Sequence, residues 1–209
     1  MENEILNHLK KVLHPDAIIL HGSRARGKER RHSDWDFVML YNKPTDVKGG
    51  RMSYQNQNIE YSVTTLPVLD IFETFSAKLH GAKVLYQRNK EGTDLLQQAS
   101  DYYAQGVYWS PEKIADHTLW IEARINGMRD SIENPIVFNK YFADFYSRVF
   151  NYWYWITQHQ HSQPIYIAID DIATKDPIYY ERVTQLVDGN TSLAKKTALA
   201  GEIAELLFK

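Results

Sequence analysis

The sequence contains no cysteine, which excludes disulfide bonds and metal sites built on thiolates. It also lacks any apolar run of the 18 or more residues that a membrane-spanning helix requires. Its first residues, Met1 to Glu4, are acidic and lead into an amphipathic segment, which is unlike a signal peptide. From these absences we expect a cytoplasmic protein with no membrane partner.

A strong net charge is absent as well. The 24 Lys and Arg residues nearly balance the 26 Asp and Glu residues, and the net charge is −2. This balance argues against a protein that wraps nucleic acid through bulk electrostatics. Basic residues are nevertheless concentrated in one short segment, which carries Arg24, Arg26, Lys28, Arg30 and Arg31.

The patterning of the first part of the chain predicts a sheet with flanking helices. A length of 209 residues allows one large domain or two small ones. Apolar residues at helical spacing predict a helix over 2–13, and short apolar or alternating runs predict strands. The predicted strands are 17–21, 34–41, 59–64 and, less regularly, 52–54 and 83–86. Pro67 and Gly81 mark the expected start and end of one further helix.

From about residue 91 onward the periodicity indicates helices. They are expected at 91–104, 111–133, 139–160, 176–187 and 192–208, while residues 163–172 fit either a strand or a helical turn. We therefore predict an α+β protein, in which a sheet domain over residues 1–90 is followed by an all-helical bundle over residues 91–209.

Two aspartates at the start of the second strand are the first chemical signal. Asp34 and Asp36 are two residues apart, so on a strand their side chains share a face. Paired carboxylates repel each other unless a cation lies between them, and Mg²⁺ accepts such carboxylates together with phosphate oxygens. Two-metal sites use this arrangement for in-line displacement at phosphorus.

The segment Gly22-Ser23 supplies features that suit a phosphate. A glycine at the end of a buried strand allows a sharp turn and close approach to a ligand. A helix that starts there would direct N–H groups at an anion, and the Ser23 hydroxyl can donate to a phosphate oxygen. Glu60, on the polar face of the third strand, could add a third carboxylate as metal ligand or base.

This stretch resembles the nucleotidyltransferase superfamily of the DNA polymerase β type. The resemblance rests on Gly22-Ser23, a spacer of ten residues, Asp34-x-Asp36 and a later acidic residue, and it covers roughly residues 17–64. The spacer is that of the minimal members, and the sheet followed by helices is similar to bacterial kanamycin-type members. Glu60 stands where an aspartate is commoner in the family. It therefore matches the family pattern less closely than Asp34 and Asp36 do.

The resemblance implies a small mixed β-sheet nucleotidyltransferase domain and a metal-dependent enzyme. Such an enzyme moves a nucleoside monophosphate from an NTP to an acceptor hydroxyl and releases pyrophosphate. Asp34, Asp36 and Glu60 would be the catalytic metal ligands for Mg²⁺ or Mn²⁺. Gly22 and Ser23 would bind the NTP phosphates with Arg24 and Lys28, the basic residues nearest the turn.

Other interpretations remain open at this point. The basic segment fits a solvated face as well as a phosphate site, and His21 and His32 suit capping or packing better than Mg²⁺ binding. The acidic balance favours a small molecule or a protein as acceptor over RNA. We expect the aromatic helices to contact the acceptor, although they also suit a homodimer interface. The alternative function is that of an antitoxin-like or otherwise non-catalytic nucleotide-binding partner.

Overall fold

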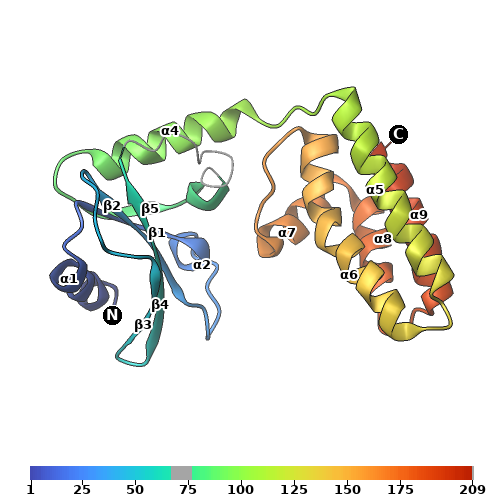
Figure 1. The fold of residues 1–209 in the computed structure, drawn as a ribbon, viewed down its shortest axis with the longest axis horizontal. Coiled ribbons are helices and arrows are strands. Elements are labelled where there is room, and N and C mark those ends of the chain that lie inside the picture. Colours follow the sequence, from blue (N-terminus) through green and yellow to red (C-terminus); the bar gives the residue numbers. More distant parts are fainter. Residues whose placement is uncertain (67–76, 209) are drawn as a thin grey trace. The chain divides into compact units, whose positions relative to one another are not determined.

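The computed structural model describes residues 1–66 and 77–208, and the chain divides into two compact units. Unit 1, Met1–Gln105, contains the β-sheet, and unit 2, Gly106–Lys209, is built from helices (Figure 1). None of the helices in this described part of the chain is long and apolar enough to cross a membrane.

Unit 1 is a five-stranded mixed sheet with helices on both faces. Its elements are α1 (Glu2–Leu13), β1 (Ala17–His21), α2 (Gly22–Ala25), β2 (Trp35–Tyr41), β3 (Gly50–Tyr54), β4 (Gln57–Thr65), β5 (Lys83–Gln87) and α4 (Glu91–Gln105). The strands lie in the order β3-β4-β2-β1-β5. Only the β2–β4 pair is parallel among the described strands, and the other pairs are antiparallel.

Alternation along the central strands creates two cores, one on each side of the sheet (Figure 1). On one face, Ile5 and Leu9 of α1 pack against Leu20 and Phe37. On the other face, Leu95 of α4 belongs to a smaller cluster that is completed by Ala17, Ile19, Val38, Leu40, Leu79 and Ala99. Both faces of β1 and of most of β2 are therefore buried, which explains their nearly continuous apolar sequences.

Unit 2 is a helical bundle around one large core. Its elements are α5 (Pro111–Asp130), α6 (Pro135–Tyr152), the π-helix η1 (Trp153–Gln158), α7 (Ile165–Lys175), α8 (Pro177–Val187) and α9 (Leu193–Phe208). Three of the helices begin in the same way, with proline in the first turn and a side-chain cap from Ser110, Asn134 or Asp176. The core is unusually aromatic, with Trp153, Tyr154 and Tyr179 fully buried.

The α+β class predicted from the sequence is confirmed, with local differences. The ambiguous segment 163–172 is largely helical, as α7. The weak strand at 52–54 is a full partner of β4, and the hairpin turns at Gln55 and Asn56, which both have positive φ. The helix expected from Pro67 falls mostly on residues outside those described. Its end is visible, since 77–79 are helical and Gly81 has a φ of 72°.

The division between the two units falls after Gln105, whereas the sequence analysis placed a domain boundary after residue 90. The difference is α4, whose sequence is helical like that of unit 2 but whose apolar face packs on β1 and β5. Periodicity reports that a segment is helical and leaves open which neighbour covers its apolar face.

Candidate functional site

The turn that follows β1 brings Gly22 against Asp36. Gly22 has a φ of 75°, a conformation that other residues rarely adopt. A Cβ atom built at this position would overlap Oδ2 of Asp36. Glycine is therefore required at this position for two reasons: the backbone has a positive φ, and the Asp36 carboxylate leaves no room for a Cβ atom. Ser23 follows it, half-buried, and its carbonyl accepts a hydrogen bond of 2.9 Å from the backbone N–H of Lys28.

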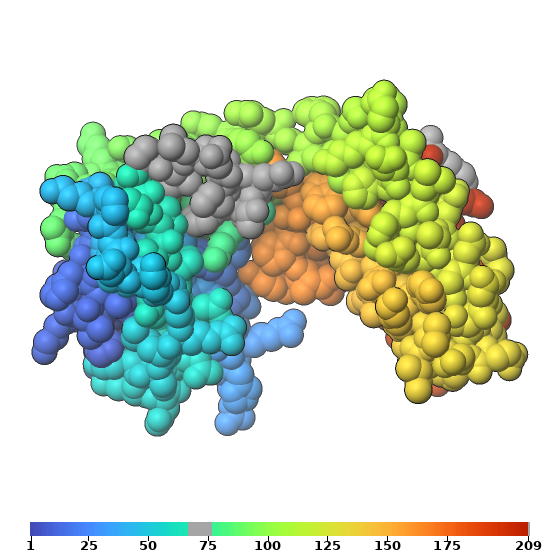
Figure 2. Space-filling view, in the orientation of Figure 1, coloured from blue at the N-terminus to red at the C-terminus, as the bar shows by residue number. Residues whose placement is uncertain are grey.

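The helix expected after this turn is only one turn long. α2 ends at Ala25, and the segment up to β2 is irregular and mostly exposed, visible in light blue in Figure 2. Lys28, predicted to bind phosphate, lies in this exposed segment. Gly27, with a φ of 66°, ends the helical path before the remaining basic residues are reached.

Arg24 binds the main chain in front of the two aspartates. Its Nη2 donates to the carbonyl of Ser33 at 2.7 Å, and its Nε lies 3.2 Å from the carbonyls of Ser33 and Asp34. The guanidinium also stacks over the ring of Trp35, 4.4 Å from the ring centroid. Arg24 therefore joins the turn after β1 to the start of β2 and fixes where Asp34 stands.

Arg26 holds a second segment beside the same turn. Its guanidinium donates to the carbonyls of His80, Ala77 and Lys78 at 2.9, 3.4 and 3.2 Å. These carbonyls close a helical segment, where a cation is favourable. The anchored segment carries Lys78, whose charge acts on Asp36 and His21. The sequence analysis did not select Lys78, because the nearest predicted motif lies far from it along the chain.

The three predicted acidic residues lie at the same end of the parallel β2–β4 pair. Asp36 is the register partner of Glu60, and Asp34 immediately precedes β2. Asp34 and Glu60 line a depression of about 400 Å³ with Arg51. Burial raises the pKa of Asp36, and the neighbouring charges of Glu60 and Asp34 raise it further, while Lys78 and Arg24 oppose them. The carboxylates are thus close enough to disfavour full ionisation together.

Glu60 has a cationic partner that the sequence did not predict. Its Oε2 accepts from Nε of Arg51 at 2.8 Å, and Nη2 of Arg51 lies 2.7 Å from the same oxygen. The two residues are register partners on β3 and β4, and the Arg51 side chain is 81% exposed. An ion pair so open to solvent contributes little stability, so a divalent cation could displace Arg51 from Glu60.

His21 lies on the same face and is held neutral. It is the register partner of Asp36 on β1 and is 7% exposed. Burial lowers the pKa of His21 to about 3, and the charges of Lys78 and Arg26 lower it further. A neutral imidazole beside Asp36 adds no positive charge to the site. The structure therefore agrees with packing for His21 and leaves His32 exposed.

The oxygen donors of Asp34, Asp36 and Glu60 fit a hard divalent cation, although the three carboxylates do not surround a common point in this structure. Among residues 1–66 and 77–208, no three His, Asp or Glu side chains are arranged to hold a metal ion. The oxygen donors, their mutual repulsion at Asp36 and their common strand ends match what Mg²⁺ selects. Binding through Oε2 of Glu60 would require that oxygen to leave Arg51.

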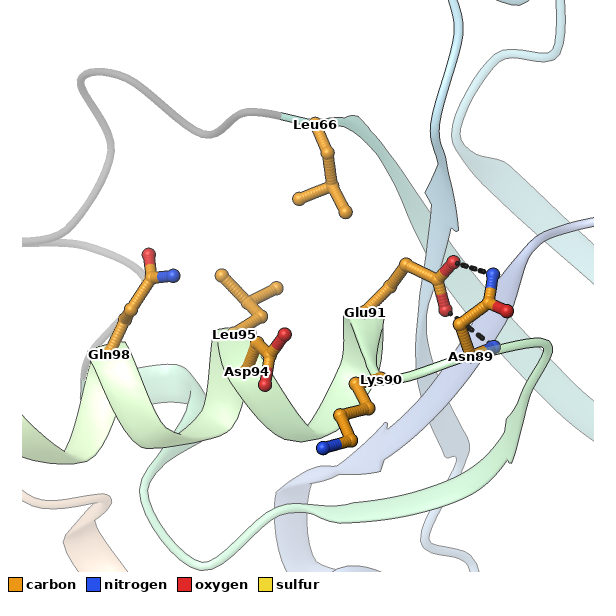
Figure 3. A pocket seen from close by; sticks show the side chains of 7 residues that line it. All are labelled: Leu66, Asn89, Lys90, Glu91, Asp94, Leu95 and Gln98. Carbon is orange, nitrogen blue, oxygen red and sulfur yellow. Dashed lines mark hydrogen bonds between the residues drawn. The ribbon is translucent and has the colours of Figure 1, made fainter.

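Another hollow lined by described residues of unit 1 lies at the opposite end of the sheet (Figure 3). It measures about 730 Å³ and lies between Leu66 and the start of α4. There Glu91 accepts hydrogen bonds from the side chains of Asn42 and Asn89, which lower the pKa of Glu91 to about 2. Because Asn42 follows the C-terminal end of β2 and Asp36 lies near its beginning, this hollow is separate from the acidic residues.

Comparison with known proteins agrees with the geometry of unit 1. Residues 3–91 match the family described as polymerase beta, nucleotidyltransferase. A nucleotidyltransferase-like protein from Exiguobacterium sibiricum 255-15 has 13% sequence identity and a TM-score of 0.49, over 99% of this chain and 72% of that chain. No protein of curated function matches the chain.

Proposed function

We propose that this chain, whose residues 3–91 belong to the polymerase β-type nucleotidyltransferase superfamily, transfers a nucleoside monophosphate from an NTP to an acceptor hydroxyl. The observation that carries the proposal is the meeting of Gly22 with Asp36, which is itself in register with Glu60. A glycine turn packed against a carboxylate and a set of oxygen ligands thus occur at one place, which suits phosphoryl chemistry.

The residues divide into three roles. Gly22 and Ser23 bind the NTP phosphates, and Lys78 supplies a positive charge near them. Asp34, Asp36 and Glu60 would hold Mg²⁺ or Mn²⁺, which would supply positive charge for the phosphate oxygens. Arg24 and Arg26 are positioning residues. The hydrogen bond of Arg24 to the main chain positions Asp34, and that of Arg26 positions Lys78. Lys28 is left as a peripheral phosphate contact.

The proposed reaction is a single displacement at phosphorus. The acceptor oxygen forms a bond to the α-phosphorus, and the bond from that phosphorus to the bridging oxygen of the β-phosphate breaks. Pyrophosphate leaves with that electron pair. The proton of the acceptor hydroxyl passes to a carboxylate, for which Glu60 is the candidate because its side chain is 46% exposed and in register with Asp36.

The proposal predicts that Asp36→Asn abolishes transfer without unfolding the protein. Release of pyrophosphate from NTPs, with Mg²⁺ and pooled acceptors, should fall by at least about 100-fold, the cost typical of a lost charge-stabilising group. Asp46→Asn is the matched control, because Asp46 is an exposed acid of the loop between β2 and β3. Equal turnover by the Asp36 variant and the wild type would refute the assignment.

The Arg51–Glu60 ion pair also bears on the alternative, nucleotide binding without transfer. While Oε2 of Glu60 stays with Arg51, that oxygen is not available to the metal. Calorimetry with NTP, in Mg²⁺ and in EDTA, separates these cases together with the turnover assay. Metal-dependent binding without any turnover would favour the non-catalytic function.

A further inference from the structure

One face of unit 2 combines aromatic rings and cations in a single surface that no step of the proposed chemistry uses. It lies on the segment just before α5, on α5 itself, on α6, which runs beside α5 (Figure 1), and on the π-helix η1. We name it the aromatic–cation cluster, and it consists of Trp109, Lys113, His117, Trp120, Arg124, Arg148, Tyr152 and Trp155. All of these except Tyr152 are at least partly exposed.

The rings are held in fixed positions by one another. Trp109 stacks on His117 with centroids 4.3 Å apart and an interplanar angle of 26°. His117 in turn shares a hydrogen bond of 2.9 Å between its Nδ1 and the hydroxyl of Tyr152. Trp155 lies 5.2 Å from Trp109 and 5.9 Å from Tyr152. A ring that is already immobilised loses little freedom when a planar ligand stacks on it.

Trp155 of the cluster lies on the π-helix that follows α6. η1 continues α6 from Trp153 with a wider turn, which changes the direction of the side chains that follow. Tyr152, the last residue of α6, and Trp155 of η1 both contact Trp109, while Trp153 and Tyr154 between them remain buried in the core. Such π-helical segments occur frequently at functional sites.

Three cations lie on the rings. The guanidinium carbons of Arg124 and Arg148 are 4.2 and 5.7 Å from the centroid of Trp120, and Nζ of Lys113 is 4.7 Å from that of Trp109. Stacked guanidinium groups keep their in-plane N–H donors available for phosphate oxygens.

These cations are only partly neutralised within the unit. Nε of Arg124 is 3.7 Å from Oδ2 of Asp144, too far for a hydrogen bond, and it is buried without a hydrogen-bond partner among the described residues. Arg148 and Lys113 appear in none of the ion pairs found within residues 1–66 and 77–208. The cluster therefore presents a local positive charge despite the net charge of −2 of the whole chain.

We propose that the aromatic–cation cluster binds a single-stranded nucleic acid, and that this strand is the acceptor of the proposed transfer. Bases stack on exposed aromatic rings and phosphates pair with Arg and Lys, and a single strand offers both at close spacing. A polycationic small molecule would be repelled by Arg124, Arg148 and Lys113. The acceptor part rests on the proposed function, whereas the binding part does not. This choice departs from the small-molecule or protein acceptor that net charge alone favoured.

The same contacts could instead serve only to pack α5 against α6, so the test must measure more than folding. Full-length protein is titrated into a fluorescently labelled 12-nucleotide single-stranded RNA of mixed sequence, without NTP or metal, and anisotropy is recorded at several salt concentrations. Arg148→Ala should weaken binding. It should also make the negative slope of log K against log salt shallower by about 0.7, the contribution of one phosphate contact on a single strand. A packing role alone would leave that slope unchanged.

A second variant tests the aromatic rings. Trp120→Ala should weaken binding by roughly 5- to 150-fold, the range expected for a lost base stack, and Trp120→Phe should recover part of the loss. Lys195→Ala is the matched control, because Lys195 is an exposed cation at the start of α9. It should bind like the wild type. If Trp120→Ala does not fold, Arg148→Ala, at an exposed residue, still decides the question.

Several results would overturn the inference. They are no binding of RNA by the wild type, an equal loss in Lys195→Ala and Arg148→Ala, or competition by AMP as strong as by the oligonucleotide. Binding without labelling of the strand in the turnover assay would overturn the acceptor role alone. Transfer to another acceptor without RNA binding would refute this inference and leave the proposed function intact, while Asp36→Asn should bind RNA as the wild type does.

Discussion

At the scale of single residues, the basic segment after β1 shows how charge can serve geometry. The sequence analysis predicted Arg24 as a phosphate ligand, and Arg26 lies in the same basic segment, yet both donate hydrogen bonds to main-chain carbonyls. A guanidinium group carries five N–H donors in a rigid planar fork, whereas a lysine ammonium group carries three donors on a flexible stem. Residue type and spacing predicted that Arg24 lies at the site, but which atoms it would contact depends on the folded path of residues 26–34.

His21 leads to a prediction about pH. Its pKa is about 3 in the folded protein and about 6.5 when unfolded. Below pH 6.5 His21 binds a proton in the unfolded chain but not in the folded chain. The free energy of unfolding therefore falls as the pH falls, by about 1.4 kcal/mol per pH unit. At pH 5 this loss amounts to about 2 kcal/mol relative to pH 8. Urea denaturation at the two values should therefore show a smaller loss for His21→Gln than for the wild type.

His32→Gln is the control for this experiment, since His32 is exposed in the segment after α2. Burial raises the pKa of Asp36, so its protonation adds stability on the acid side in every variant. Only the difference between variants reports His21. An identical loss in wild type and His21→Gln would mean that His21 is solvated in the folded protein.

At the scale of elements, two glycines in one short segment allow a matched comparison. Gly22 and Gly27 both have positive φ, but a Cβ at Gly22 would overlap Asp36, whereas one at Gly27 meets nothing within 4 Å. Gly27→Ala should cost only the backbone strain, about 1 kcal/mol. Gly22→Ala adds a collision with the carboxylate. We expect it to lower stability by at least about 1 kcal/mol more and to abolish transfer, as measured by urea denaturation and pyrophosphate release. Equal stability of the two variants would contradict the close approach.

Much of unit 1 could be predicted because its signals are local. The apolar run of β1, the alternation in β4 and the Asp34-x-Asp36 motif depend on neighbours in the sequence, and the structure places β1, β2 and β4 where they were expected. The Gln55-Asn56 turn was not recognised, because glycine usually marks such a hairpin. The contact of Arg51 with Glu60 follows from β3–β4 pairing, which no local pattern revealed.

At the scale of the whole chain, the assignment of α4 can be tested by truncation. Residues 1–105 contain both cores of unit 1, whereas residues 1–90 lack Leu95 and Ala99. Loss of Leu95 alone removes a buried side chain worth about 2 kcal/mol. We expect the 1–105 fragment to unfold cooperatively in a thermal melt by circular dichroism. The 1–90 fragment should melt at a lower temperature or remain unfolded. Equal melting temperatures would place the boundary where sequence patterning put it.

The position of β1 in the sheet has a consequence for biosynthesis. β1 is made first, but its neighbours β2 and β5 follow later, and β5 comes only after β3 and β4 have been added. In a nascent chain from which residues 83–87 have not yet emerged, the apolar strand β1 would have one edge unpaired, the edge that β5 later covers. Such an edge is a template for association with other chains. Unit 1 thus cannot complete its sheet during synthesis until β5 has emerged, and translational pauses before that point would expose the chain to aggregation.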